Sequence, residues 1–420
     1  MTVRNRGSTT ATQAAETATA AAGATAGLTP EETKARESKG RKVAIRVGLS
    51  FAMIFLALGI VWLGHLWLSL LVVFIQIGLF RELVNVRYNP AKELKVPLFR
   101  TIQWLMFFAM MFYTYGKFLI SSGLVIRLST RLEAHLLVRP VLHYHGFITF
   151  SWYVCIFVTY VLSLRTGLYK YQIGNFVWTV AILCLTVMQV RGAVYLIFEG
   201  IFWFAIPCAL VVANDSFAYI SGMCCGKRFV RAPFLSLSPN KTWEGFIGAF
   251  LITPVFGWFF SDLFSRSTWL VCPQPELLLL GDPLDCKIDE VFVPQIIHFP
   301  NQEFSLFALY AKKCQIHAFI FGIFASIVAP FGGFLASAIK RAYNIKDFDS
   351  FIPGHGGVMD RMDCQFLMLL CAYVHYSTFI RPYDLNVDQI LRVIRGMPED
   401  DQHHVMHRLA GLLNATVTAT

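Results

Sequence analysis

Long apolar runs recur between positions 47 and 376, and the polar residues gather in short segments between them. Each run is roughly 16–21 residues long, which is near the length that a helix needs to cross about 30 Å of hydrocarbon. The strands of a β-barrel would instead be about ten residues long and alternate in polarity. The pattern therefore predicts an all-α polytopic membrane protein with about nine transmembrane helices. We place them at 47–64, 66–80, 103–122, 143–163, 172–190, 193–213, 245–260, 316–336 and 364–380.

One further apolar run, at 216–225, is too short to cross. Its ten or so residues reach only about 15 Å, so we expect a short re-entrant segment that dips into the membrane and returns. Counting crossings places four polar segments on the side of the N-terminus, namely 81–102, 164–171, 214–244 and 337–363. The segment 261–315 falls on the opposite side, and its acidic residues outnumber its basic ones. Basic residues just before the first run favour a cytoplasmic N-terminus, so 261–315 is expected in a lumen.

Composition agrees with a membrane protein. The 420 residues are 56% hydrophobic and 15% charged, whereas soluble domains carry about 25% charged residues. The net charge of +10 is explained by basic cytoplasmic loops rather than by nucleic acid. We divide the chain into a disordered tail (1–42), N-terminal transmembrane helices (43–190), a C-terminal catalytic transmembrane region (191–380) and a C-terminal tail (381–420).

The ten cysteines show no CxxC spacing, so a zinc site or a disulfide framework is not expected. Cys272 and Cys286 share the segment opposite the N-terminus. They can pair if that segment faces an oxidising lumen.

Cationic side chains gather where the helix 316–336 ends. If this helix continues by one turn, Ser337, Lys340 and Arg341 share one face, because they are spaced at i, i+3 and i+4. A lysine beside an arginine suits phosphate oxygens. The alternative is that both are ordinary anchors at a cytoplasmic helix end.

A glycine-rich turn and two carboxylates follow. His355 precedes Gly356 and Gly357, whose backbone N–H groups can face an anion at the start of a helix. Asp360 and Asp363 lie at i, i+3 on that helix, and two hard oxygen ligands with open positions suit Mg²⁺ bound jointly with phosphates. Alternatively, Asp360 pairs with Arg361 as a charge at the helix start.

A second polar segment runs from Asn214 to Gly245. Asp215 is either a cap at the end of an apolar helix or a third carboxylate of the metal site. Lys241 lies in a predicted turn before a helix, free to reach an anion. Because a charge at membrane depth costs roughly 2.5–3.5 kcal/mol on insertion scales, so many charged groups at helix ends favour a functional site.

At these residues the chain resembles the CDP-diacylglycerol synthases, or phosphatidate cytidylyltransferases, of the eukaryotic type. The stretch 337–363 is similar to that family's signature, S-x-x-K-R, then K-D, then P-x-H-G-G-x-x-D-R-x-D. The Asn214-Asp215 pair and Ser-Pro-x-Lys-Thr-Trp-Glu-Gly also resemble the family, and the resemblance covers about 190–380 well. Asp349 departs from the pattern, which has a small residue there. The acidic residue that bacterial members place before the Lys-Arg pair is absent, which puts more weight on Asp215.

The resemblance implies transfer of a cytidylyl group from CTP to phosphatidic acid, giving CDP-diacylglycerol and pyrophosphate for phospholipid synthesis. It implies Mg²⁺ held by Asp360 and Asp363, with Asp215 as a further candidate ligand. Lys340 and Arg341 would join Asp360 and Asp363 as catalytic residues. The implied substrate-binding residues are Ser337, Lys346, Asp347, His355, Gly356, Gly357, Arg361 and Lys241.

The implied partners are CTP, phosphatidic acid and the lipid bilayer, without nucleic acid, and a homodimer stays open. The endoplasmic reticulum is favoured as the location, with the active site facing the cytoplasm. Two alternatives are a CTP-dependent kinase of a polyprenol or phytol and, from another class, an anion transporter.

Overall fold

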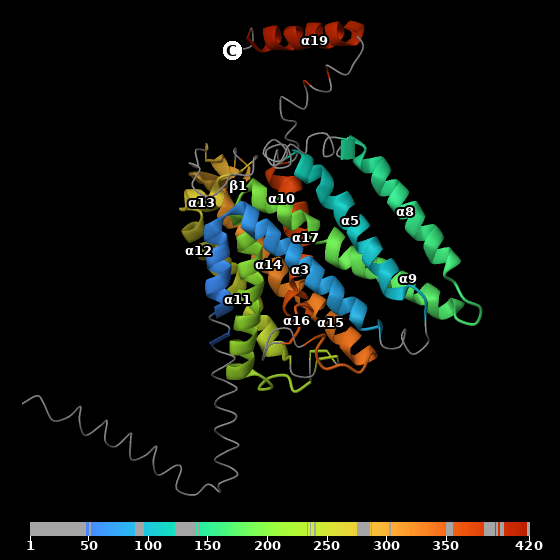
Figure 1. Ribbon diagram of the computed structural model, residues 1–420. Coiled ribbons are helices and arrows are strands. Elements are labelled where there is room, and N and C mark those ends of the chain that lie inside the picture. The colour runs from blue at the N-terminus through green and yellow to red at the C-terminus, as the bar shows by residue number, and fades with distance from the viewer. Residues whose placement is uncertain are drawn as a thin grey trace, which may run out of the picture.

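The computed structural model describes residues 48–49, 52–88, 96–121, 140–141, 143–232, 234–235, 237–238, 241–274, 286, 288–301, 304–349, 356–381, 391, 394 and 399–417. The predicted tail 1–42 lies outside these residues. Figure 1 shows a bundle of helices that run between two ends. The labelled helices of the bundle are α3 (His65–Asn85), α5 (Phe99–Ser121), α8 (His145–Leu162), α9 (Tyr169–Leu183), α10 (Arg191–Glu199), α11 (Ile201–Cys225), α12 (Trp243–Phe264), α13 (Thr268–Val271), α14 (Lys313–Ile327), α15 (Pro330–Ala342), α16 (Met359–Met362) and α17 (Gln365–His375).

Six helical stretches of the described chain are long and apolar enough to cross a membrane. They are α3, α8, α11, α12 and two composite stretches, Tyr169–Glu199 and Lys313–Ala342. Two shorter apolar helices, Ala52–Leu63 and Gln365–Ile380, also belong to the bundle. The chain is thus a multi-pass membrane protein. The finer count of nine spans stays a prediction; of the nine predicted runs, 193–213 divides between two helical stretches, Tyr169–Glu199 and Ile201–Cys225.

The predicted re-entrant segment is wrong. Residues 216–225 continue α11, which runs without a break from Ile201 to Cys225. Asp215 therefore lies inside this helix and not at its end. The polar pair Asn214-Asp215 interrupts the hydrophobic pattern but not the helix. The Asp215 side chain lines a cavity and is not buried among apolar side chains.

The predicted helix 193–213 is also wrong, because the chain breaks at Gly200 between α10 and α11. Gly200 has a φ of 135°, and a Cβ there would lie 3.1 Å from the carbonyl oxygen of Val271. Glycine fits this backbone conformation without strain. The break lets α10 turn away, and Glu199 at its end accepts a hydrogen bond of 2.9 Å from the Tyr376 hydroxyl, a polar contact between helices.

Helices α11, α12 and α14 pack closely. A Cβ at Gly245 of α12 would lie 2.7 Å from the carbonyl oxygen of Ala218, and one at Gly248 would lie 2.4 Å from Ser221 Oγ. Small residues at such contacts let helix backbones approach each other within a membrane. This approach brings Asp215 of α11 beside the start of α12.

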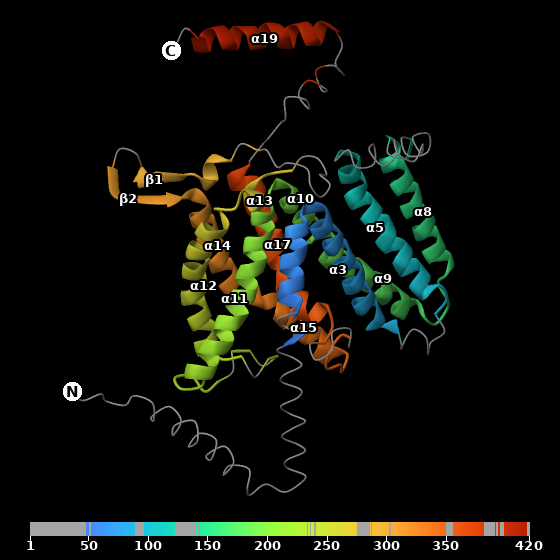
Figure 2. The ribbon, with the colours of Figure 1, turned by 60° about the vertical axis from the view of Figure 1, so that its left-hand side comes forward.

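The two ends of the bundle differ, and Figures 1 and 2 agree on which elements lie at each. One end, here the signature end, holds α15 and α16. The other, the hairpin end, holds α13 and two antiparallel strands, β1 (Pro294–Asn301) and β2 (Phe304–Lys312). The expected all-α class is therefore corrected by one small hairpin, which lies within the segment predicted on the side opposite the N-terminus.

A disulfide joins Cys272 and Cys286 at the hairpin end, with a Cα–Cα distance of 5.9 Å. Disulfides persist in oxidising compartments. The side of the membrane on which this segment lies stays a prediction, and the signature end is the opposite end of the bundle.

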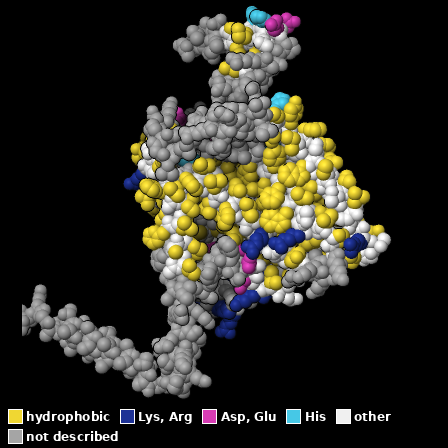
Figure 3. Space-filling view, viewed as in Figure 1, with side chains coloured by type: hydrophobic (Ala, Val, Ile, Leu, Met, Phe, Trp, Pro, Cys, Tyr) yellow, Lys and Arg dark blue, Asp and Glu magenta, His cyan; other side chains and the backbone are white. Residues whose placement is uncertain are grey.

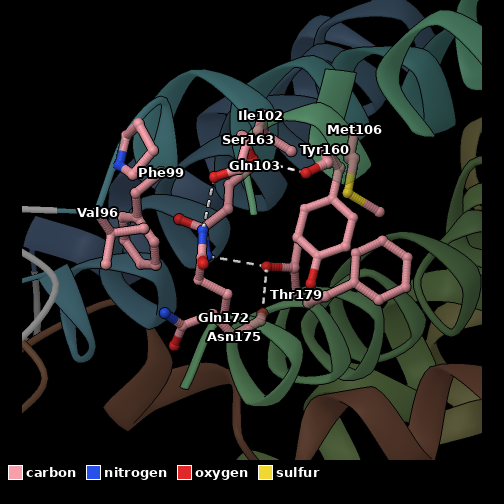
Figure 4. A pocket seen from close by; sticks show the side chains of 12 residues that line it. Val96, Phe99, Ile102, Gln103, Met106, Tyr160, Ser163, Gln172, Asn175 and Thr179 are labelled. Carbon is pink, nitrogen blue, oxygen red and sulfur yellow. Dashed lines mark hydrogen bonds between the residues drawn. The ribbon is translucent and has the colours of Figure 1, made fainter. Parts of the chain in front are cut away.

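A small polar cluster joins the N-terminal helices α5 and α9 (Figure 4). Gln103 Nε2 donates to Thr179 Oγ1 at 2.8 Å, and that hydroxyl donates to the Asn175 carbonyl at 2.9 Å. The adjoining cavity measures only about 30 Å³, room for one or two waters. This cluster holds helices together and is too small for a nucleotide or a lipid headgroup.

The surface reflects the membrane setting. Figure 3 shows a broad apolar band across the helices, with most visible Lys and Arg side chains at its lower edge, near the lower ends of α3 and α15. Basic side chains at this level suit the boundary between hydrocarbon and headgroups.

Candidate active site

The cations of the signature lie on the last turn of α15. This helix starts at Pro330, where proline fits the first turn, and its last turn carries Lys340 and Arg341. The predicted extension of the helix through both residues is confirmed. They line a cavity of about 430 Å³, here the cationic cavity, formed by Leu237, Ser238, Ser337, Lys340, Arg341, Asn344, Ile345 and Lys346.

Asp360 is tied to this helix. Lys340 Nζ lies 2.7 Å from Asp360 Oδ1, and the Asp360 side chain is only 8% exposed. Asp360 Oδ2 accepts hydrogen bonds from the backbone N–H groups of Phe348 at 3.1 Å and Gly357 at 3.0 Å. Both carboxylate oxygens therefore already have donors in this conformation, and the alternative pairing of Asp360 with Arg361 is not what the structure shows.

The glycine turn wraps around the Asp360 carboxylate. Gly356 has a φ of 82°, and a Cβ there would lie 3.0 Å from Asp360 Oδ2 and 3.5 Å from Asp347 Oδ1. Glycine is needed for both reasons, the backbone conformation and the close approach. His355 lies outside the described residues.

Glu82, which was not among the predicted site residues, contacts the segment that follows this turn. Glu82 of α3 is 2% exposed, and its carboxylate accepts hydrogen bonds from the N–H groups of Val358 at 2.7 Å and Met359 at 2.8 Å. In the sequence Glu82 follows Arg81, directly after an apolar run. The expected helix ended at position 80 and left Glu82 in a polar segment, where an acid beside a base gives no signal of function.

Asp363 lies between α16 and α17, pressed against the start of α15. A Cβ at Gly332 would lie 2.1 Å from the Asp363 carbonyl oxygen, and one at Gly333 would lie 3.3 Å from its Oδ2. Asp363 Oδ1 accepts a hydrogen bond of 2.8 Å from the Cys364 N–H. Burial raises the pKa of the Asp363 carboxyl above its ordinary value, and the charge of Asp215 adds to that rise.

Asp215 lines a second cavity, of about 560 Å³, between α11, α12 and α15. We call it the α11–α12 cavity. Lys241 lines it too, with Nζ 4.7 Å from the ring centre of Phe334. Lys241 and Arg361 are close enough to Asp215 for their charges to act on it. Its full lining is Asn214, Asp215, Ala218, Tyr219, Gly222, Met223, Phe234, Ser238, Lys241, Thr242, Gly245, Phe246, Ala249, Pro330 and Phe334.

The segment before α12 is held by its own side chains. Thr242 caps α12 by accepting a hydrogen bond of 3.1 Å from the Gly245 N–H, as expected of a threonine N-cap. Glu244 Oε1 accepts from the N–H groups of Phe229 at 3.0 Å and Val230 at 2.8 Å. These bonds hold the chain on both sides of Ser238, which lines both cavities.

The predicted metal ligands do not form one cluster. In the part of the chain that the structure describes, no three His, Cys, Asp or Glu side chains lie together as a metal site. Asp215 and Asp363 are near each other and, among the described residues, neither forms an ion pair. Two neighbouring carboxylates of this kind fit a divalent ion that shares its coordination with phosphates.

The structure therefore brings together most of the predicted residues. Lys340, Arg341, Lys346 and Ser337 line the cationic cavity, while Lys241 and Asp215 line its neighbour. Ser337 Oγ also donates to the Gly333 carbonyl at 2.8 Å. Asp347 lies beside the glycine turn, and Arg361 lies near Asp215.

Comparison with known proteins shows the family. A family described as the cytidylyltransferase family matches residues 44–379, which include both polar segments. Phosphatidate cytidylyltransferase 1 of Arabidopsis thaliana is 38% identical over 358 residues, which cover 84% of this chain and 83% of that protein.

Two other relatives give similar figures. Phosphatidate cytidylyltransferase 2 of Homo sapiens is 36% identical over 369 residues, covering 87% of this chain and 80% of that protein. A probable phosphatidate cytidylyltransferase of Dictyostelium discoideum is 36% identical over 380 residues, covering 89% and 78%. The likeness thus spans most of both chains in each pair.

Proposed function

This chain belongs to the cytidylyltransferase family, as a phosphatidate cytidylyltransferase that converts CTP and phosphatidate to CDP-diacylglycerol. From this premise we propose that each of its two cavities binds one of the two substrates. CTP would place its triphosphate in the cationic cavity, where Lys340, Arg341 and Lys346 balance its charge. Phosphatidate would enter the α11–α12 cavity, with its phosphate near Lys241.

One observation supports this division above all others, namely the contrast between two adjoining cavities. The cationic cavity is lined by three basic side chains and suits a polyanion. The α11–α12 cavity is lined mostly by aromatic and small residues, with Asp215 as its acid and Lys241 as its one cation among the described residues. A lipid with one phosphate and two acyl chains fits such a lining. Ser238 lies in the wall where the two phosphates would meet.

We propose that Asp363 and Asp215 would hold Mg²⁺ jointly with the substrate phosphates. When bound there, the ion would supply charge neutralisation at the reacting phosphates. Asp360 was expected as a ligand as well. Because Asp360 is bonded to Lys340 and to two backbone N–H groups, we now give it the role of holding Lys340 and the glycine turn in place.

The transfer itself needs little proton chemistry. A phosphatidate oxygen attacks the α-phosphorus of CTP, a new P–O bond forms, and the bond to the β-phosphate breaks to release pyrophosphate. The attacking phosphate is already ionised near neutral pH, so no general base is required. The protein contributes alignment of two anions and cations that offset their repulsion.

The purified protein in detergent tests this proposal with CTP labelled at defined phosphates. We expect α-phosphate label to enter a chloroform-soluble product and γ-phosphate label to leave as pyrophosphate, with both events abolished by EDTA and restored by Mg²⁺. Label from the γ-phosphate in lipid would instead identify a lipid kinase. Flux across sealed vesicles without nucleotide turnover would identify a transporter.

We also propose that the signature end faces the cytoplasm of the endoplasmic reticulum. Lys346 lies at the signature end, whereas Ile288, which is 44% exposed, lies before β1; the test variants are Lys346→Cys and Ile288→Cys. In sealed microsomes with the cytoplasmic face outward, a membrane-impermeant maleimide should label position 346 above the level of the parent protein, and position 288 only after detergent is added. The reverse order of labelling would invert this orientation.

A further inference from the structure

We propose that Glu82, far from the signature in the sequence, is a positioning residue of the active site that holds the glycine turn and α16 in their working place. This inference rests on the proposed function of the site. It assigns a catalytic purpose to α3, a helix of the N-terminal region that no signature residue occupies.

Glu82 is buried as a carboxylate with backbone donors only. Its side chain is 2% exposed and, within the described ranges, no Lys or Arg forms an ion pair with it. Its two oxygens take one N–H group each, from Val358 and Met359. A buried charge is expensive in a membrane helix, so a residue that only packed α3 would be apolar.

The glycine turn is built around this contact. A Cβ at Gly357 would lie 2.6 Å from Glu82 Oε2 and 3.0 Å from the Asp349 backbone nitrogen. Any side chain at position 357 would therefore push Glu82 away. The requirement for glycine here comes from the close approach of Glu82 and of the Asp349 backbone, since the positive φ belongs to Gly356.

Two carboxylates thus hold the same turn from opposite sides. Asp360 accepts the Gly357 N–H from within the turn, while Glu82 accepts the next two N–H groups from α3. Met359 begins α16, which carries Asp360 and Arg361 and ends beside Asp363. Displacing the start of α16 would therefore move both Lys340, through Asp360, and the Asp363 carboxylate.

Glu82→Gln tests this role, because glutamine keeps the shape but can accept from only one of the two N–H groups. Groups that orient metal ligands typically contribute about 10- to 100-fold to metal affinity or activity, so we expect Mn²⁺ binding, measured by electron paramagnetic resonance in detergent, to weaken by that factor. The KM for CTP should rise with it. The KM for phosphatidate should change little, because Glu82 does not contact the α11–α12 cavity. Glu82→Asp keeps the charge on a shorter side chain, so its Mn²⁺ affinity and its KM for CTP should lie between those of the parent protein and of Glu82→Gln.

Gln76→Leu is the matched control. Gln76 is also buried in α3, and it donates to the Thr186 carbonyl at 3.0 Å and accepts from the Tyr115 hydroxyl at 2.9 Å. Its replacement should lower thermal stability without changing Mn²⁺ binding or the KM for CTP. If Glu82→Gln matches this control in both measurements, the inference is overturned.

Two further measurements keep the inference testable if Glu82→Gln folds poorly or if the proposed metal site is wrong. Gly357→Ala disturbs the same contact from the other side and should reproduce the loss of Mn²⁺ affinity. Amide hydrogen exchange of the peptide around 356–362 should become faster in Glu82→Gln and unchanged in Gln76→Leu. If the parent protein binds no Mn²⁺, the metal assignment fails by itself, and exchange together with the KM for CTP decides the role of Glu82.

Discussion

Replacing Asp363 with Asn is expected to lower the turnover of CTP by about 10³-fold or more, because it removes a charged ligand from the site where phosphate charge is neutralised. The protein should still insert and fold, since asparagine keeps the shape and removes a buried charge. Incorporation of α-labelled CTP into lipid measures the first effect, and thermal unfolding in detergent measures the second. Mn²⁺ binding should be lost in parallel.

Asp262→Asn provides the matched control for this change. Asp262 lies near the hairpin end, where its carboxylate pairs with Lys312 at 2.9 Å and with Arg266 at 2.6 Å. The same chemical substitution there should leave turnover within about twofold of the parent, since distant sites act independently. Near-normal turnover by purified Asp363→Asn would refute the metal assignment.

Replacing Lys340 with Met should reduce kcat/KM by about 10²- to 10³-fold, the usual effect of removing one group that stabilises developing charge. It should also lower stability by about 1–3 kcal/mol, the cost of leaving a buried polar group without its partner. That group is Asp360, whose side chain is 8% exposed and pairs with Lys340 at 2.7 Å. Steady-state kinetics and thermal unfolding measure the two losses.

The double variant Lys340→Met/Asp360→Asn separates these effects. Removing both charges should restore most of the stability, because no unpaired carboxylate is left, while activity stays low. Recovery of activity together with stability would mean that Lys340 serves only to neutralise Asp360. The proposed contact between Lys340 and the triphosphate would then be excluded.

The cationic part of the site was predictable because it is local. Ser337, Lys340 and Arg341 share a helix, so their common face follows from helical spacing alone. The pairing of Lys340 with Asp360 was not predictable in this way. It depends on how the chain between them turns, and Phe348 and Gly357 supply N–H groups that a sequence pattern does not display.

The distant parts of the site lay beyond sequence reasoning for a different reason. Glu82 contacts residues 276 and 277 positions later in the chain, and no motif links them. Asp215 was singled out as a candidate ligand, yet its helix was cut short because a polar pair within an apolar run resembles a boundary. The break at Gly200 was missed because a single glycine within an apolar run does not mark a boundary by itself, and its close approach to the Val271 carbonyl oxygen comes from a distant segment.

The unbroken course of α11 has a consequence for the lipid that the enzyme uses. Its 25 residues extend about 38 Å, roughly 8 Å more than the hydrocarbon layer. Asp215 lies ten residues before the end of the helix, or about 15 Å, so it stays below the headgroup plane even if the whole excess projects at that end. If phosphatidate binds in the α11–α12 cavity as proposed, its phosphate has to leave the headgroup plane to react, and the larger product has to return to that plane before it diffuses away. The rate of turnover should therefore depend on bilayer thickness, because a thicker bilayer lengthens the path of phosphatidate into the site and of the product out of it.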